Sequence, residues 1–227
     1  MRPNGRDVLI ELFEREFLDP LERGGARVAG TFRDLDDPDR FVWFRGFADH
    51  GVRLRSLTDF YSSDLWLRNR EAANATIVDN DDVLLLKPAS GRLIDPESEA
   101  PSATDPEGPK GLIVLETFLL PPGSHDDFAG FFVREIDPTL RELEGSPFAT
   151  LATDPRPNDY PRLPVRENES VFVTATRFED TESHAAFLRS LAAAARWRDA
   201  IAPELVRRTI APPQLTRLDP TKRSVLR

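Results

Sequence analysis

The residues best suited to chemistry lie on one strand-like run, Arg40–Asp49. Because side chains alternate along a strand, Trp43 and Arg45 share a face with two phenylalanines. A guanidinium among aromatic rings is costly to bury alone, and its fork of N–H groups fits a carboxylate or an enolate. We therefore take Trp43 and Arg45 as candidate ligand-binding residues. The competing explanation is an internal ion pair of Arg45 with a carboxylate such as Asp34 or Glu116.

Three further residues complete the candidate ligand-binding set. Tyr61 follows in a helical run, and with Trp43 it is suited to line a flat apolar pocket, although aromatic residues at such spacing more often belong to the core. Thr174 and Thr176 lie on the corresponding face of a second, similar strand-like run. None of these residues forms a recognisable catalytic set, so the catalytic residues are left unassigned.

Metal and cofactor chemistry finds little support in the sequence. The chain has no cysteine, which excludes disulfides, thiolate metal sites and a cysteine nucleophile. Its three histidines, His50, His125 and His184, fall near predicted helix starts without a metal-ligand spacing, which leaves only a weak case for a haem ligand or a general base. The run Asp79–Asp82 lacks the glycine and distal glutamate of a calcium loop. We predict no metal and no cofactor.

The overall composition limits the partners. A net charge of −9 and a pI near 5.0 argue against nucleic acid. The sequence contains no apolar run of membrane-spanning length and no apolar stretch of a signal peptide near Met1, so no membrane partner and a cytoplasmic location are expected. The composition is compatible with a small apolar or anionic ligand and with assembly into a homo-oligomer.

An internal repeat sets the expected architecture. The run Arg40–Asp49 recurs as Ser170–Asp180, and pairs of equivalent residues are 131 positions apart, as in Phe41 with Phe172 and Trp66 with Trp197. Residues 111–227 read strand, helix, strand, strand, helix, strand, which is the split βαβ order of ferredoxin-like domains. The predicted organisation is a first repeat over 1–88, a Pro- and Ser-rich linker over 89–110, and a second, degenerate repeat over 111–227.

The two copies differ in two places. Met1–Gly5 aligns with Leu120–Gly123, the turn after the first strand of the second copy, so the first repeat lacks its first strand. That strand is central in a split βαβ sheet, and its loss leaves two open edges. Either the start is misplaced or truncated, or the linker, the C-terminal tail or another subunit fills the space. The second copy also carries a proline-rich insertion, Pro155–Glu167, expected to be an ordered flap or a mobile loop.

The run Phe32–Phe47, followed by Phe60-Tyr61 and by Trp66, resembles the NIPSNAP family. The resemblance implies an α+β fold in which two tandem ferredoxin-like (βαββαβ) repeats form a dimeric α/β-barrel-type unit. The biochemical role of the family is mostly undefined. On this fold we expect the face of Trp43 and Arg45 to point into the barrel, and the smaller apolar face to lie under helices.

Three functions follow as alternatives. The first is a small-molecule-binding or accessory protein with a pocket between the sheets, into which Arg45 and Tyr61 point. The second is a cofactor-independent monooxygenase, isomerase or cyclase acting on an aromatic or polyketide-like substrate, by analogy of fold alone. The third is a structural role, in which exposed sheet edges mediate oligomerisation.

Overall fold

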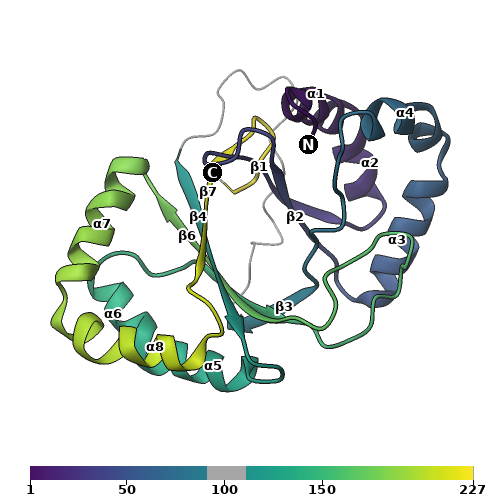
Figure 1. Ribbon diagram of the computed structural model, residues 1–227. Helices are drawn as coiled ribbons and strands as arrows, with labels where there is room; N and C mark the ends of the chain where they lie inside the picture. The colour runs from purple at the N-terminus through teal and green to yellow at the C-terminus, as the bar shows by residue number, and fades with distance from the viewer. Residues whose placement is uncertain (91–110, 227) are drawn as a thin grey trace.

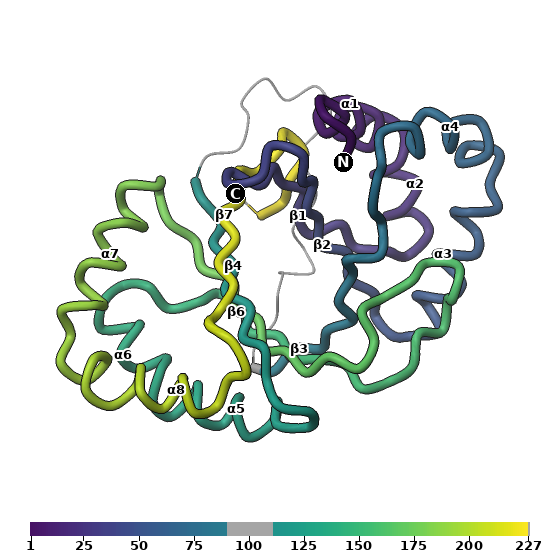
Figure 2. Tube along the Cα trace, viewed as in Figure 1, coloured from purple at the N-terminus to yellow at the C-terminus, as the bar shows by residue number. Residues whose placement is uncertain are grey.

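The computed structural model describes residues 1–90 and 111–226 and has an α+β fold. One antiparallel sheet curls through the middle, and two groups of helices lie on its opposite outer sides (Figures 1 and 2). The strands are β1 (Arg27–Asp34), β2 (Phe41–Gly46), β3 (Leu86–Ser90), β4 (Leu112–Leu120), β5 (Ala149–Thr153), β6 (Ser170–Phe178) and β7 (Gln214–Pro220). The predicted α+β fold class is thereby confirmed.

The helices fall into one group from each half of the chain. The first group is α1 (Gly5–Leu12), a π-helical turn (Phe13–Phe17), α2 (Leu18–Arg23), α3 (His50–Ser62) and α4 (Asp64–Asn74). The second group is α5 (His125–Phe131), a π-helical turn (Phe132–Ile136), α6 (Asp137–Glu142), α7 (Thr181–Ala193), a π-helical turn (Trp197–Ile201) and α8 (Ala202–Arg208). None of the helices in the described ranges is long and apolar enough to cross a membrane.

The order of strands in the sheet is β2-β1-β7-β4-β6-β5-β3. The second half contributes β7-β4-β6-β5, which is the fourth-first-third-second order of a βαββαβ unit. The first half is divided: its β1 pairs with β7 and its β3 pairs with β5. In the same unit order, a first strand of the first half, which has no equivalent in the described ranges, would lie between β3 and β2. We call this position, between the two end strands of the sheet, the strand gap.

The C-terminal tail does not occupy the strand gap. It runs beside β1, where the amide of Thr221 donates to the carbonyl of Thr31 at 2.9 Å and the amide of Leu226 donates to that of Ala29 at 3.0 Å. The expectation that this tail might replace the strand is therefore wrong. The linker lies largely outside the described residues.

The two faces of the sheet are the reverse of the expected ones. Val42 and Phe44 pack in the concave interior against an apolar cluster that contains Phe32. Trp43 packs instead on the convex side, in the helix-covered cluster that contains Phe13. A tightly curled sheet leaves less room on its concave side than under the helices, so the bulkier aromatic face packs outward.

Equivalent helices in the two halves begin in the same way. The carboxylate of Asp49 accepts from the amide of Val52 at 2.7 Å, and that of Asp180 accepts from the amide of Ser183 at 2.8 Å. Each cap satisfies an otherwise unpaired amide of the first helical turn, in α3 and α7 respectively.

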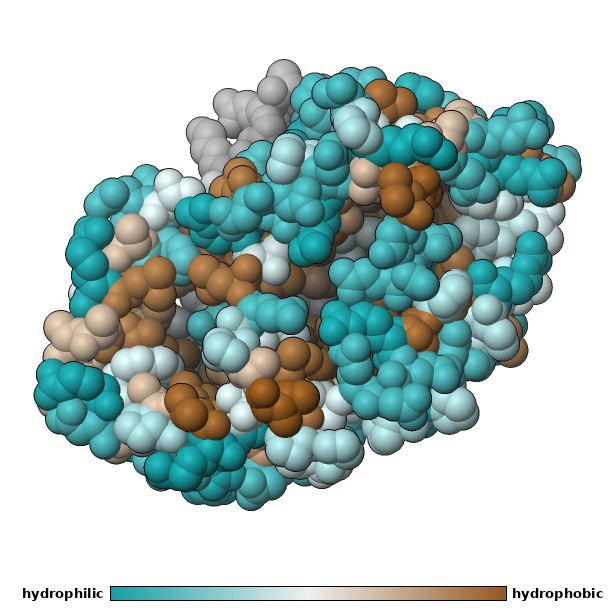
Figure 3. Space-filling view, in the orientation of Figure 1, coloured by the Kyte–Doolittle hydropathy of each residue, from teal (hydrophilic) through white to brown (hydrophobic). Residues whose placement is uncertain are grey.

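On the face shown in Figure 3, polar residues predominate, and apolar side chains gather in a recessed region over the second half.

Candidate functional site

Arg45 of β2 is a cation enclosed by aromatic rings. Its guanidinium carbon lies 4.6 Å from the centroid of the Trp43 ring and 5.6 Å from that of Phe47. Nη1 of Arg45 is inaccessible to solvent and has no hydrogen-bond partner in the described part of the chain. Burial lowers the pKa of Arg45, whereas the hydroxyl of Tyr61 raises that pKa through its charge and a hydrogen bond.

Arg45 does not form an ion pair with Asp34 or Glu116, the two carboxylates that were expected as its alternative partners. Asp34 instead accepts the amide of Asp36 at 2.8 Å and lies 3.7 Å from Arg40. Glu116 lies on β4 in the other half, where burial raises its pKa. Across residues 1–90 and 111–226, Arg45 has no carboxylate within ion-pair distance. Arg45 is partly buried as a residue, and the N–H groups of its buried Nη1 are free to donate to an anion.

The proline-rich insertion is an ordered flap that reaches from the second half onto α3. Tyr160 of the flap is buried and stacks on Tyr61 of α3, with ring centroids 6.0 Å apart and planes inclined by 22°. The hydroxyl of Tyr160 is also buried without a hydrogen-bond partner. Buried polar atoms in proteins are normally paired. Two unpaired polar groups, Nη1 of Arg45 and this hydroxyl, therefore belong to residues that both contact Tyr61.

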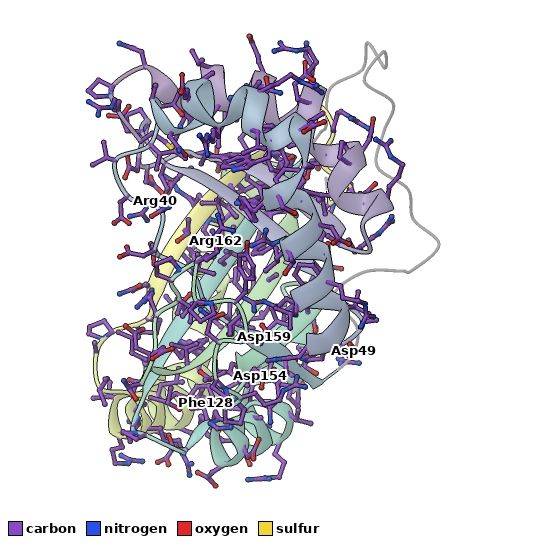
Figure 4. The ribbon with its side chains drawn as sticks, turned by 90° about the vertical axis from the view of Figure 1, so that its right-hand side faces the viewer. Arg40, Asp49, Phe128, Asp154, Asp159 and Arg162 are labelled. Atoms are coloured by element: carbon purple, nitrogen blue, oxygen red, sulfur yellow. The ribbon has the colours of Figure 1, made fainter. Side chains whose placement is uncertain are left out.

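Polar contacts secure the flap at the start of α3. Arg53 forms an ion pair with Asp159, and its Nη2 donates to the side-chain oxygen of Asn158 at 3.1 Å. Nε2 of His50 lies 3.2 Å from a carboxylate oxygen of Asp154. Figure 4 shows Asp154 and Asp159 beside the helix that begins after Asp49. The flap is held by charge at the start of α3 and by ring stacking further along it.

The structure brings only three of the five predicted ligand-binding residues together. Trp43, Arg45 and Tyr61 gather between β2 and the helices of the first half. Thr174 and Thr176 are buried on β6, where they pair with Glu116 and Val114 of β4. These threonines occupy the repeat positions equivalent to Trp43 and Arg45. A repeat places such positions in separate halves, so they do not share a site.

The expected pocket between the sheets does not contain Arg45 or Tyr61, because both lie on the convex side. Hollows of about 390 and about 190 Å³ lie elsewhere on the surface, and neither includes these residues. The larger one is lined by Asp79, Asp81, Asp82, Pro164, Val165 and Arg166. Within the described ranges, no group of three or more acidic or histidine side chains is arranged to hold a metal ion.

Arg53, Asn158 and Tyr160 are site residues that the sequence did not single out. Each owes its place to a contact between positions about a hundred residues apart, made by the inserted flap. The insertion itself was visible, and its proline content indicated an element outside the regular strands. The sequence held no signal for the surface that the flap covers.

No protein-family model and no curated protein sequence matches this chain, so the NIPSNAP resemblance is unconfirmed. Among solved structures, a "putative monooxygenase" from Lactobacillus acidophilus NCFM is 11% identical with a TM-score of 0.47, covering 92% of this chain and 88% of that one. Another from Fusobacterium nucleatum is 14% identical with a TM-score of 0.45, covering 92% and 87%.

Proposed function

We propose that this protein is a NIPSNAP-type binding protein that receives a carboxylate group at Arg45. The observation that carries the proposal is Nη1 of Arg45, which is buried with no partner in the described ranges. A guanidinium offers two parallel N–H donors that match the two oxygens of a carboxylate. The rings of Trp43 and Phe47 hold the guanidinium in place, so little side-chain entropy is lost on binding.

The neighbouring cation does not compete for the same anion. Arg53 already pairs with Asp159 and with Asn158. Arg45 therefore supplies the positive charge that is still to be neutralised. The buried hydroxyl of Tyr160 provides one further hydrogen-bonding group next to Tyr61. An anionic ligand with an apolar body suits this combination of charge and aromatic rings.

Binding explains the site better than catalysis does. A cofactor-independent monooxygenase, isomerase or cyclase needs an acid or base aimed at the substrate. The two carboxylates that contact His50 at the start of α3 are already engaged, Asp154 by Arg156 and Asp159 by Arg53. The enzyme alternative thus has no free carboxylate among these residues, and the groups left to it are the hydroxyls of Tyr61 and Tyr160.

Titration with benzoate tests the proposal. Thermal shift and the fluorescence of the tryptophans would be followed for the unchanged protein and for Arg45→Met. We expect Arg45→Met to weaken benzoate binding at least about tenfold, which corresponds to about 1.4 kcal/mol. Arg40→Met is the matched control, because Arg40 is half exposed on the same hairpin and already faces two carboxylates. Equal affinity in the Arg45 and Arg40 variants would refute the site.

A cytoplasmic location and a homo-oligomeric state are also kept as proposals. The first is supported by the acidic, cysteine-free composition. The second is supported by the position of β2 and β3, which are the end strands of the sheet among residues 1–90 and 111–226. Size-exclusion chromatography with light scattering would test the oligomeric state directly.

A further inference from the structure

Three neighbouring polar side chains on the convex side of the second half have no partner. Glu116 of β4 pairs in register with Thr174 of β6, and Thr176 follows two positions along, so the three side chains share one face of the sheet. This face is the one under the helices, because Phe118 and Phe172, which alternate in step with them, pack in the cluster beneath α5 and α7. Within residues 1–90 and 111–226, none of the three side chains forms a hydrogen bond or an ion pair. Unlike Nη1 of Arg45, their oxygens are not fully enclosed, so they open onto a space beside the sheet.

The space lies between α7 and β7. Leu188 of α7 lies on the same side of the helix as His184 and Leu191, four residues after the first and three before the second. His184 and Leu191 are buried, but Leu188 is 41% exposed, so α7 does not close onto the sheet at this point. Leu215 of β7, the other register neighbour of Glu116, is 43% exposed. Glu116 therefore lies at the floor of a hollow in the second half, where Figure 3 shows apolar side chains in a recessed region.

The charge of Glu116 is not neutralised by any described residue. Arg217 of β7 is the cation next in register, two positions after Leu215 and on the same face. Nε of Arg217 donates instead to a carboxylate oxygen of Asp36 at 3.0 Å. Burial raises the pKa of Glu116, and no neighbouring cation counteracts this shift. A carboxylate in such surroundings is stabilised in its ionised form by a ligand that brings a positive charge and hydrogen-bond donors.

We propose that this hollow binds a primary ammonium group on an apolar body, with Glu116 as its counter-ion. An ammonium group has three N–H donors, and the carboxylate of Glu116 with the hydroxyls of Thr174 and Thr176 supplies acceptors for all three. The apolar side chains of Leu188 and Leu215 at the mouth of the hollow suit the apolar body of the ligand. The site takes a ligand of the opposite charge to the one proposed for Arg45 and does not depend on it.

Titration of the full chain with benzylamine tests the proposal by isothermal calorimetry. Benzylamine is an ammonium ion at pH 7, and benzyl alcohol is its uncharged counterpart of similar size. We expect benzylamine to bind at least about tenfold more tightly than benzyl alcohol, and Glu116→Gln to remove this preference. Glu182→Gln is the matched control, because Glu182 of α7 has an 80% exposed side chain that pairs with Arg189. Equal affinity for benzylamine in the Glu116 and Glu182 variants would overturn the proposal.

Two further variants locate the bound ammonium group. Thr174→Val removes one acceptor and keeps the branched shape, so it should weaken benzylamine binding about threefold to tenfold and leave benzyl alcohol unaffected. Leu188→Trp should fill the hollow and weaken the binding of both ligands. Equal affinity of the unchanged protein for the two ligands, or no binding of benzylamine at millimolar concentration, would also overturn the proposal. Arg45→Met should weaken only benzoate binding, so failure of the ammonium site and failure of the anion site are distinguishable.

Discussion

Tyr61 of α3 and Tyr160 of the flap stack with their ring centroids 6.0 Å apart, and this contact joins the two halves of the chain on the convex side of the sheet. Tyr61 also contacts Arg45 through its hydroxyl. The flap thereby covers the residue that positions the candidate anion site. Since no equivalent insertion exists in the first half, the two halves differ in what their convex faces can bind.

The first prediction concerns release of this flap. Arg53→Ala removes the ion pair with Asp159 and the hydrogen bond to Asn158. We expect a loss of about 1–3 kcal/mol in the free energy of unfolding, because the partly buried carboxylate of Asp159 keeps only its longer contact with Nδ1 of His50, at 3.6 Å. Brief trypsin digestion should cut faster after Arg162 of the flap, whose next residue is Leu163.

Arg141→Ala is the control for the flap experiment. Arg141 pairs with Asp137 one helical turn away, and its side chain is 72% exposed. Exposed pairs of this kind contribute only a few tenths of a kcal/mol. An unchanged cleavage pattern in both variants would show that Arg53 does not hold the flap.

A second prediction concerns the acid sensitivity of the flap. Hydrogen bonds from Arg156 hold the pKa of Asp154 well below its ordinary value of 3.8. A lowered pKa means that the folded state favours the ionised form, so the stabilisation is complete above about pH 4 and is lost as the pH falls further. Asp154→Asn should therefore lower Tm at pH 6–7, and the difference from the unchanged protein should shrink below pH 4. A constant difference across pH 3–7 would contradict this assignment.

The fold could be predicted from the sequence because repetition carries information that single elements lack. Aromatic residues at a constant offset, such as Trp66 and Trp197, predicted which strands and helices of the two halves correspond. Which face of each strand points into the concave interior of the sheet was not predictable in this way. Val42 and Trp43 alternate equally well in either orientation, and only the curl of the whole sheet decides which of them faces inward.

The candidate site was predictable only where it depends on local spacing. Trp43 and Arg45 share a strand face, and Tyr61 lies on the helix that follows. Tyr160 is 99 positions from its stacking partner, and nothing in a proline-rich insertion indicates where it docks. Contacts between distant segments depend on the assembled surface, which composition and periodicity do not describe.

A third prediction concerns the equivalent helix caps. Asp49→Ala and Asp180→Ala each remove a side-chain acceptor from the first turn of α3 or α7. Each variant should lose about 1 kcal/mol in the free energy of unfolding, measured by urea denaturation. Asp49→Asn and Asp180→Asn should lose much less, because asparagine also caps well. Because α3 also anchors the flap, Asp49→Ala should in addition speed tryptic cleavage after Arg162, and Asp180→Ala should not.

The last prediction separates Glu116 from the candidate anion site. Glu116 lies in the second half, and burial raises its pKa above the ordinary value of 4.5. A raised pKa means that the folded state binds a proton more tightly, so this carboxylate destabilises the protein increasingly as the pH rises above 4.5. Glu116→Gln should therefore increase Tm by about 2–4 °C at pH 7, and the gain should disappear near pH 4.

Benzoate titration of the same variant completes the test. Glu116 pairs with Thr174 on β6, whereas Arg45 lies on β2 under the other group of helices. Affinity for benzoate should therefore stay the same in Glu116→Gln while Tm rises. A lower Tm at pH 7 would show that the carboxylate has a stabilising partner, and a changed affinity would show that the two halves share one binding site.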